Sequence, residues 1–320
     1  MSRSNFPTLL NSFLSSMNTT PGHTRNYSLA QVSIQVESDL KFSEDTFEEK
    51  FKKFQIDTPG RDLVRIRHDF SIIPPIIDDS WQLIYKKKPW AIYKKDKYWI
   101  YLGILGEETS TDLWITGIFN ESYTEGLICH PDATRFLQGK NHSLTLYPTD
   151  QIILARVLAD RQAFYIHAAG MILYDKGVLF VGHSEAGKST TVTMLKDEGE
   201  ILCDDRIIVR HWPDGFRIHG TWSHGDVPDV SNSSAPLRAI FFLEKSPENC
   251  LEPIENRREI IRMLPFYIVQ PLVTADWWEK TLDMIQQISQ EVPFYRLKLD
   301  TSGKVKEILK EYLSQDSVRS

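Results

Sequence analysis

The sequence predicts an α/β protein with a phosphate-loop core, in which helices flank a mixed sheet, and a smaller, mostly β N-terminal domain. Three observations carry this prediction. Residues 63–147 are rich in Ile, Tyr, Trp and Thr, and polar turns separate their short apolar runs, as in antiparallel strands. Beyond residue 164 the pattern becomes strand, loop, helix and strand. The loop before that helix reads Gly-x-x-x-x-Gly-Lys-Ser, which is typical of phosphate-binding loops.

The composition narrows the class of protein. Of the 320 residues, 41% are hydrophobic and 25% are charged, as in globular proteins. The net charge of −6 argues against a nucleic-acid partner, because general affinity for nucleic acid comes from clustered Lys and Arg. The 3 cysteines show no CxxC spacing, which argues against a disulfide scaffold or a thiolate zinc site. The few cysteines fit a reducing compartment, so we expect a cytoplasmic protein. Because no apolar run is long enough to span a bilayer, we expect no membrane partner.

We expect four segments along the chain. They are a flexible or amphipathic N-terminal segment (1–27), a mostly β accessory or substrate-recognition domain (28–148), a phosphate-loop domain (149–316) and a short tail (317–320). In the first segment, apolar residues recur at helical spacing from Phe6 to Met17, followed by a flexible stretch over 18–26. This pattern predicts a short helix that docks on this chain or on a second copy, so a homo-oligomer is compatible with the sequence.

The N-terminal domain begins with an alternating segment over 29–36, which predicts a strand. A helix is expected next, capped by Ser43 and presenting Phe47, Phe51 and Phe54 on one face. Further strands are expected at 81–85, 90–93, 98–105, 113–119 and 144–146, before a boundary at Tyr147-Pro148. Lysines interleave with aromatic residues over 86–99. This pattern fits a hairpin with one wet face, and the alternative is a site for single-stranded nucleic acid.

The second domain is expected to open with a helix over 149–161. Apolar runs predict strands at 164–168, 171–174, 178–181, 201–209, 237–244 and 293–299, with a helix over 188–197. Two amphipathic helices are expected near the C-terminus. The first would bury Trp278, Leu282, Ile285 and Ile288, and the second Val305, Ile308, Leu309, Tyr312 and Leu313.

The phosphate loop is the strongest chemical signal. It runs Gly182-His183-Ser184-Glu185-Ala186-Gly187-Lys188-Ser189 and is followed by Thr190. Glycines let the backbone curl so that N–H groups face inward, and the helix N-terminus adds partial positive charge. Lys188 would reach the β- and γ-phosphates of a nucleotide, and the Ser189 hydroxyl would bind Mg²⁺. An apolar strand before the loop and a helix after it supply the required context.

A pair of carboxylates, Asp204 and Asp205, interrupts the apolar run 201–209. Adjacent aspartates in an apolar strand are unfavourable to bury unless they meet a cation or a hydrogen-bonding ligand. Neighbouring residues of a regular strand point to opposite faces, so both aspartates serve one site only if the strand ends or bulges there. The alternative is that one aspartate orients Mg²⁺ while the other is solvated.

The segment His167-Ala168-Ala169-Gly170, the loop 182–190 and Asp204-Asp205 together resemble the catalytic domain of HPr kinase/phosphorylase. They are also similar to the serine kinases found beside ribosomal-peptide modification genes, and more distantly to PEP carboxykinase. The resemblance covers about residues 150–220 and implies ATP and Mg²⁺ as cofactors. It implies Asp205 as general base, Asp204 nearer the metal and His167 as a group that stabilises the transferred phosphoryl. Glu244, at the end of a later strand, would complete the Mg²⁺ shell.

The sequence departs from this family at several points. Family members usually carry Ser-Gly where this chain has Ser184-Glu185, which places a carboxylate beside the phosphate channel. The downstream signature for docking HPr and a decarboxylation site are not found, so we expect neither HPr as substrate nor PEP carboxykinase activity.

Downstream residues offer further candidates. His219, His224 and Asp226 fit either a metal cluster or an ordinary surface loop. Arg206 and Arg238 are candidates for neutralising phosphate charge, or for pairing with structural carboxylates.

The expected activity is transfer of a γ-phosphate to a hydroxyl, with serine of a peptide or small protein as the leading acceptor and a small-molecule alcohol as its variant. The expected catalytic residues are Asp205, His167 and Lys188. Two other classes stay open. One is a nucleotide-binding ATPase or switch whose N-terminal domain binds a partner. The other is a catalytically altered scaffold, which Glu185 suggests.

Overall fold

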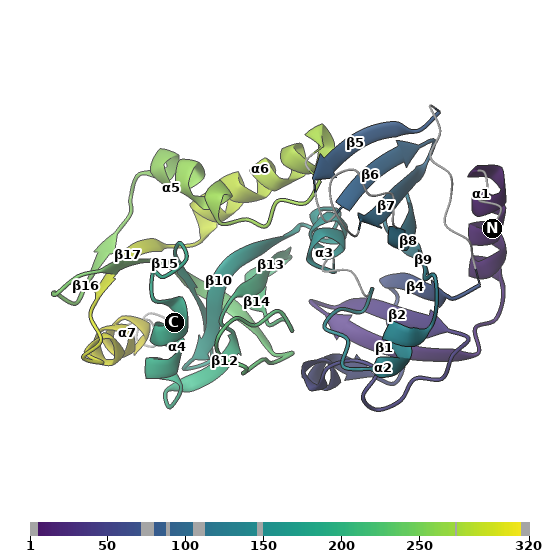
Figure 1. Cartoon of the computed structure of the whole chain (residues 1–320). Coiled ribbons are helices and arrows are strands. Elements are labelled where there is room, and N and C mark those ends of the chain that lie inside the picture. Colours follow the sequence, from purple (N-terminus) through teal and green to yellow (C-terminus); the bar gives the residue numbers. More distant parts are fainter. Residues whose placement is uncertain are drawn as a thin grey trace. The chain divides into compact units, whose positions relative to one another are not determined.

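The computed structural model describes residues 6–71, 80–87, 90–104, 113–145, 150–272 and 274–314. The chain divides into two compact units, Met1–Ile153 and Leu154–Ser320, and each is described by itself. Each unit contains a mixed β-sheet with a few helices (Figure 1). The predicted α/β class with a mostly β N-terminal part is therefore confirmed at this level.

The first unit contains a nine-stranded sheet with the order β3-β1-β2-β4-β9-β8-β7-β6-β5. Its strands are β1 (His23–Leu29), β2 (Val32–Ser38), β3 (Gln55–Ile56), β4 (Leu63–Asp69), β5 (Gln82–Lys87), β6 (Trp90–Lys95), β7 (Tyr98–Ile104), β8 (Leu113–Asn120) and β9 (Glu125–Cys129). Only the β2–β4 and β4–β9 pairings among these are parallel. The expected antiparallel character is therefore correct for most of the described sheet, including the lysine-rich β5–β6 hairpin.

The predicted single strand over 29–36 is wrong in one respect, because this segment contains a hairpin turn. Leu29 ends β1 and Val32 begins β2, with Leu29 opposite Val32 in the ladder. Ala30 and Gln31 make the turn with φ values of 50° and 63°, the left-handed pair that a two-residue hairpin requires. Gly and Asn usually fill such positions, so Ala-Gln gave no turn signal. The stretch 18–26, expected to be flexible, includes the first residues of β1.

The N-terminal helix is present as α1 (Phe6–Asn18). Phe13 and Met17 lie in a core cluster with Trp81 and Ile100, so the helix docks on its own unit. Arg67 on β4 fixes its C-terminal end, because Nη1 donates to the carbonyl oxygens of Ser16 at 2.7 Å and Thr19 at 2.9 Å.

The remaining short elements of this unit are η1 (Glu49–Phe54) and α2 (Thr134–Gln138). The three phenylalanines of the expected helix are buried, but η1 is a single 3₁₀ segment. The strand expected at 144–146 is absent from the described part, where Leu144 and Thr145 form a turn. Tyr147-Pro148 lies outside the described residues.

The second unit contains an eight-stranded sheet. Its strands are β10 (Ala163–Leu173), β11 (Lys176–Val181), β12 (Gly199–Cys203), β13 (Arg206–Trp212), β14 (Gly215–His219), β15 (Ser234–Lys245), β16 (Cys250–Pro253) and β17 (Phe294–Leu299). The central strands β11, β15 and β17 are parallel neighbours, and β10, β12, β13, β14 and β16 pair antiparallel. The parallel partner of β11 is thus β15. The predicted strand, helix, strand pattern suggested the next strand along the chain instead, and that expectation is wrong.

Helices flank this sheet (Figure 1). They are α3 (Asp150–Ala159), α4 (Lys188–Leu195), α5 (Arg257–Met263), η2 (Leu264–Phe266), α6 (Ala275–Glu291) and α7 (Val305–Ser314). One core cluster joins α4 and α7 to the sheet through side chains such as Val192, Leu309 and Phe241. The C-terminal helices are where the amphipathic patterns predicted them. The buried face of α6 carries Trp277 and Met284, whereas Leu282 is 47% exposed.

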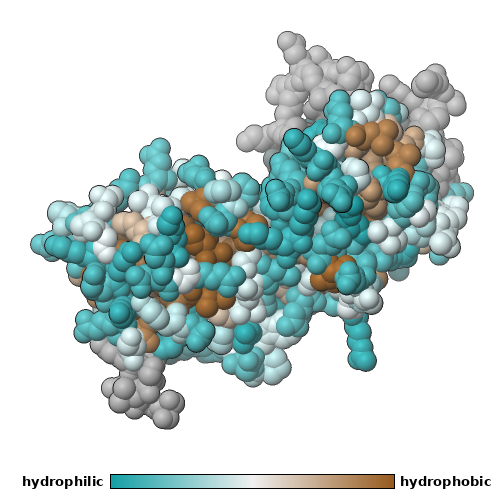
Figure 2. Space-filling model, turned by 90° about the horizontal axis from the view of Figure 1, so that it is seen from below, coloured by the Kyte–Doolittle hydropathy of each residue, from teal (hydrophilic) through white to brown (hydrophobic). Residues whose placement is uncertain are grey.

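The surface agrees with the composition. The face drawn in Figure 2 is mainly hydrophilic, with hydrophobic residues in separate patches. Among the described helices, none has the length and apolar character to cross a membrane.

Candidate functional site

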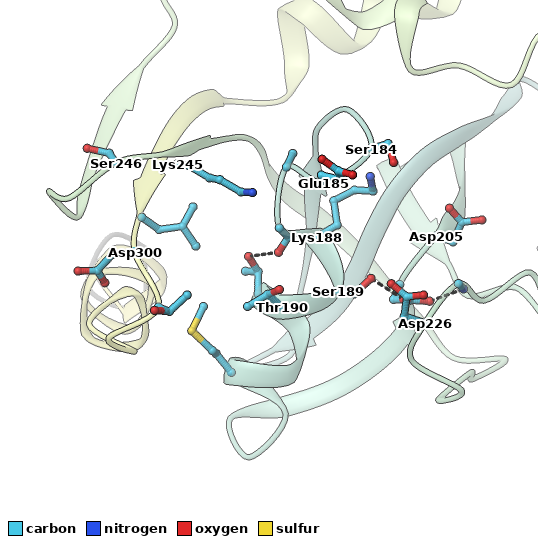
Figure 3. A pocket seen from close by; sticks show the side chains of 18 of the residues that line it. Ser184, Glu185, Lys188, Ser189, Thr190, Asp205, Asp226, Lys245, Ser246 and Asp300 are labelled. Carbon is cyan, nitrogen blue, oxygen red and sulfur yellow. Dashed lines mark hydrogen bonds between the residues drawn. The ribbon is translucent and has the colours of Figure 1, made fainter.

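A pocket of about 980 Å³ lies over the N-terminus of α4 (Figure 3). The loop 184–187 and the first residues of α4 form its floor, and His167, Asp204 and Asp205 lie among its lining residues. All of these belong to the second unit. The fold thus brings the predicted loop, the acidic pair and the upstream histidine to one cavity. Gly182 and His183 belong to the loop but are not among the lining residues.

Two glycines shape the loop between β11 and α4. Gly187 precedes α4 with φ at 100°, a conformation that side-chain-bearing residues rarely adopt. A Cβ on Gly182 would lie 2.5 Å from the Cβ of Ala186, so the closed shape of the loop depends on hydrogen at that position. Thr191 completes the turn, since its backbone N and its Oγ1 both donate to the Gly187 carbonyl at 2.8 Å.

Lys188 extends across this loop. Its Nζ donates to the carbonyl oxygens of Gly182 at 3.0 Å and His183 at 3.1 Å. Burial lowers the pKa of Lys188, while the negative charges of Asp205 and Asp204 oppose that change. The lysine is therefore a largely buried cation held over backbone oxygens beside the pocket.

Glu185 occupies an unusual backbone position. It lines the pocket and has φ at 67°, in the left-handed region that favours glycine. This is the position at which the sequence departs from the Ser-Gly of the family it resembles. Its carboxylate places negative charge at the edge of a cavity otherwise suited to phosphate.

The strand carrying the acidic pair does end at that pair. Strand β12 stops at Cys203 and β13 begins at Arg206, so Asp204 and Asp205 occupy the break between them. Asp204 is buried, and its Oδ2 accepts from the Ser189 hydroxyl at 2.8 Å. Asp204 Oδ1 accepts from the backbone N of Gly225 at 2.6 Å, and Oδ2 also accepts from that of Val227 at 3.0 Å. Asp204 therefore connects the first turn of α4 to the loop after β14.

Asp205 faces a different set of partners. His167 Nε2 donates to Asp205 Oδ1 at 2.9 Å, and Arg206 Nη1 pairs with Oδ2. Burial alone would raise the pKa of Asp205, but the His167 hydrogen bond and the charges of Arg206 and Lys188 hold it below its usual value. Asp205 is thus an ionised carboxylate, oriented by a histidine on the lining of the same pocket.

The other sequence candidates lie in different places. Asp226 and Gly225 line the pocket. Glu244 is exposed on β15 opposite Lys298 in the register, and it is not among the lining residues. Arg238 lies with its guanidinium 5.2 Å from the centroid of the Tyr312 ring, also away from the lining residues.

The alternative of a metal cluster at His219, His224 and Asp226 is not realised. His219 is buried, accepts a hydrogen bond from Trp212 Nε1 at 3.3 Å, and burial lowers its pKa to about 4. His224 lies beside its own loop, 3.0 Å from the Gly225 carbonyl. Within the described ranges, no three His, Cys, Asp or Glu side chains are grouped so that they could hold a metal ion. Asp204 and Ser189 remain as adjacent oxygen donors.

Several lining residues gave no signal in the sequence. Lys245 ends β15 and Ser246 and Pro247 follow it, and Asp300 and Thr301 follow β17. They reach the pocket because β15 and β17 are parallel and Lys245 is opposite Leu299 in the register.

A contact with the loop was missed as well. The Tyr267 hydroxyl lies 3.2 Å from His183 Nε2, and the two ring centroids are 5.0 Å apart. Because the Tyr267 carbonyl also accepts from His167 N at 2.7 Å, one residue contacts both the loop and the strand that carries His167.

Comparisons with known proteins place this site in a family. No curated protein matches the chain. A solved structure of the Hpr(Ser) kinase/phosphatase from Coxiella burnetii matches with 10% identity and a TM-score of 0.30, covering 48% of this chain and 98% of that one. This likeness is too weak to define the fold. The family model of the SynChlorMet cassette protein ScmC matches residues 140–314, which is more than half of the chain and includes the pocket. The chain therefore belongs to the ScmC family of SynChlorMet cassette proteins.

Proposed function

We propose that this chain is a kinase of the HPr kinase type that transfers the γ-phosphate of ATP to a hydroxyl, with Mg²⁺ as cofactor. Serine of a peptide or small protein is the proposed acceptor, and a small-molecule alcohol is the variant. The observation that carries the proposal is the His167–Asp205 pair, joined at 2.9 Å on the lining of the pocket that also holds Lys188 and Ser189. A phosphate site alone would serve any nucleotide-binding protein, whereas an oriented carboxylate beside it supplies a base for an acceptor hydroxyl.

Residues of the loop would bind the donor. Lys188 would exchange its bonds to the Gly182 and His183 carbonyls for oxygens of the β- and γ-phosphates. Backbone N–H groups over 184–190 and the N-terminus of α4 favour the same negative charge. These residues supply positioning and charge neutralisation, which account for most of the catalysis of phosphoryl transfer.

Ser189 and Asp204 fit the requirements of Mg²⁺, which prefers hard oxygen ligands. Their oxygens are 2.8 Å apart at the base of the pocket, and Asp204 is held by two backbone N–H groups. When bound, the ion would neutralise charge on the β- and γ-phosphate oxygens. Glu244 is left out of this proposed shell, because it does not line the pocket.

Asp205 would act on the acceptor. Its carboxylate accepts a hydrogen bond from the hydroxyl and takes its proton as the oxygen attacks the γ-phosphorus and ADP leaves. Its lowered pKa keeps it ionised at neutral pH, and a weak base suffices where bond breaking to the leaving group leads. His167 orients Asp205 through this hydrogen bond and would stabilise charge near the transferred phosphoryl group.

The domain organisation follows the same proposal. Residues 149–316 would form the phosphate-loop kinase core, and residues 28–148 would be an accessory domain that recognises the acceptor or another partner.

The test follows the γ-phosphate by ³¹P NMR, using purified full-length protein, ATP and Mg²⁺, with and without serine-containing peptides or free serine. The proposal expects phosphate on a hydroxyl, and Asp205→Asn should keep ATP binding while losing transfer. Lys188→Ala should lose ATP binding. Release of free phosphate with no phosphate on a hydroxyl would favour the ATPase or switch. Binding without turnover across the panel would favour the scaffold, and either result would overturn the kinase proposal.

A further inference from the structure

The pocket extends well beyond the phosphate loop. Its volume of about 980 Å³ is at the upper end of the roughly 300–1,000 Å³ range of small-molecule sites, and a chain of phosphates would leave much of it unfilled. The loop divides it into two sides in Figure 3, where Asp205 and Asp226 lie on one side and Lys245, Ser246 and Asp300 on the other. The proposed function uses the first side and leaves the second without a role.

The second side is built by strand ends. Strands β11, β15 and β17 are adjacent and parallel, with Val181 opposite Phe242 and Lys245 opposite Leu299 in the registers. Their carboxyl ends therefore meet at one edge of the sheet, which is where open α/β sheets bind ligands. The phosphate loop leaves β11, Ser246-Pro247 leaves β15, and Asp300-Thr301 leaves β17. The Ser246 backbone N donates to the Leu299 carbonyl at 3.1 Å, which holds these last two segments together.

The side chains on this side differ from those around Asp205. Met194, Pro247 and Leu299 supply an apolar surface, and Ser246, Asp300 and Thr301 supply hydroxyl and carboxylate groups beside it. Lys245 extends toward the loop in Figure 3 and is a second cation on the pocket lining, apart from Lys188. An apolar surface with a few polar groups is the usual composition of a small-molecule or cofactor site.

Asp300 has a fixed geometry. Ser302 donates to its Oδ1 twice, from the hydroxyl at 2.5 Å and from the backbone N at 2.9 Å. Its own backbone N donates to Asn249 Oδ1 at 3.2 Å, so the turn after β17 is tied to the turn after β15. A carboxylate only accepts hydrogen bonds, and beside an anionic ligand it selects donor groups such as hydroxyls.

We propose that this side of the pocket is a nucleoside subsite, in which the base packs on Met194, Pro247 and Leu299 and the ribose hydroxyls donate to Asp300. Lys245 binds the phosphates from the side opposite Lys188. The subsite rests on the proposed function, because it requires a nucleotide on the phosphate loop. It explains why the pocket continues over two strand ends that phosphate alone does not need.

The test compares three probes by isothermal titration calorimetry of the full-length protein with Mg²⁺: ATP, 2′,3′-dideoxy-ATP and inorganic tripolyphosphate. The parent should bind ATP at least about 10-fold more tightly than tripolyphosphate, although tripolyphosphate is the more compact anion. Asp300→Ala should weaken the affinity for ATP about 5- to 10-fold and leave the affinity for tripolyphosphate unchanged. This variant should also bind ATP and dideoxy-ATP with equal affinity. Lys245→Gln should weaken the affinities for ATP and for tripolyphosphate by the same factor. Asp214→Ala, at an exposed turn outside the pocket lining, is the matched control and should behave as the parent.

The outcomes separate the two proposals. The subsite would be overturned if the parent bound ATP and tripolyphosphate with equal affinity, or if Asp300→Ala changed both affinities equally. Either result would leave the proposal that the loop binds phosphate unaffected. If the folded parent binds none of the three probes, the proposed function fails and the subsite fails with it.

Discussion

Glu185 provides the sharpest test of how the loop meets phosphate, because its charge and its backbone conformation can be changed separately. Glu185→Gln removes the charge and keeps a side chain at φ of 67°. Glu185→Gly removes the charge and also removes the strain of holding a side-chain-bearing residue in the left-handed conformation. Glu279→Gln, an exposed glutamate on α6 away from the pocket lining, is the matched control.

The magnitude follows from exposure and charge. Glu185 is exposed, so a water-like dielectric applies, and a unit charge at about 7 Å contributes roughly 0.6 kcal/mol. A Mg²⁺-bound nucleoside triphosphate carries about two net negative charges, so removing the carboxylate should strengthen binding by about 1 kcal/mol, or about 5-fold in Kd. The gain should shrink at high salt, since exposed charges are screened.

The backbone effect should appear in stability instead. A non-glycine residue in the left-handed region costs about 1–2 kcal/mol, and the greater freedom of glycine in the unfolded chain returns about 0.4–1 kcal/mol of that. Glu185→Gly should therefore raise the free energy of unfolding by about 0.8 kcal/mol over Glu185→Gln, while both variants bind ATP alike.

Calorimetric titration with ATP at low and high salt, together with urea unfolding, gives both quantities. If Glu185→Gln binds ATP no more tightly than the Glu279→Gln control at low salt, the carboxylate does not face the phosphates and the reasoning is wrong.

Three further predictions concern the same fold. Gly187→Ala meets no atom within 4 Å but is strained at φ of 100°, so it should lower the free energy of unfolding by about 1–2 kcal/mol and weaken ATP, as urea unfolding and calorimetry would show. Asp204→Ala removes three hydrogen bonds of a buried carboxylate and should lower the free energy of unfolding by about 1–3 kcal/mol, because neutral donors lose their acceptor; no measurable effect would contradict its linking role. His68 is buried with its Nδ1 2.9 Å from His130 Nε2, and burial lowers the pKa of His68 to about 4. Because the unfolded chain binds its proton near pH 6.5 and the folded chain does not, stability should fall by up to about 3 kcal/mol as pH drops from 6.5 to 4, with a smaller slope in His68→Gln.

The turn between β11 and α4 could be predicted because the residues that shape it are local. Glycines, Lys188 and the flanking strand and helix lie within a short stretch, so their spacing already fixes the turn. The break between β12 and β13 could be predicted only conditionally: two adjacent aspartates serve one site only where the strand ends or bulges. The position of the two aspartates within the apolar run therefore indicated where the strand could end, which the composition of the run alone does not.

Other features depend on pairings between distant segments. Lys245 and Asp300 meet because β15 and β17 are parallel neighbours, and nothing in their local sequence indicates that register. The buried face of α6 turns toward Trp277 rather than Leu282 for the same reason, because the surface that it covers is made elsewhere in the chain.

These two origins divide the pocket in a way that bears on its chemistry. Parallel strand ends deliver the loop, Lys245 and Asp300, whereas the break between antiparallel strands delivers Asp204 and Asp205. Under the proposed function, donor binding and acceptor activation would thus rest on different parts of the sheet, and changes on one side need not disturb the other. The hydrogen bond from Ser189 to Asp204 joins the two sides at 2.8 Å. Ser189→Ala should therefore weaken both ATP binding and transfer, whereas Asp205→Asn should affect transfer alone, and the contrast between these variants would measure how far the two sides are coupled.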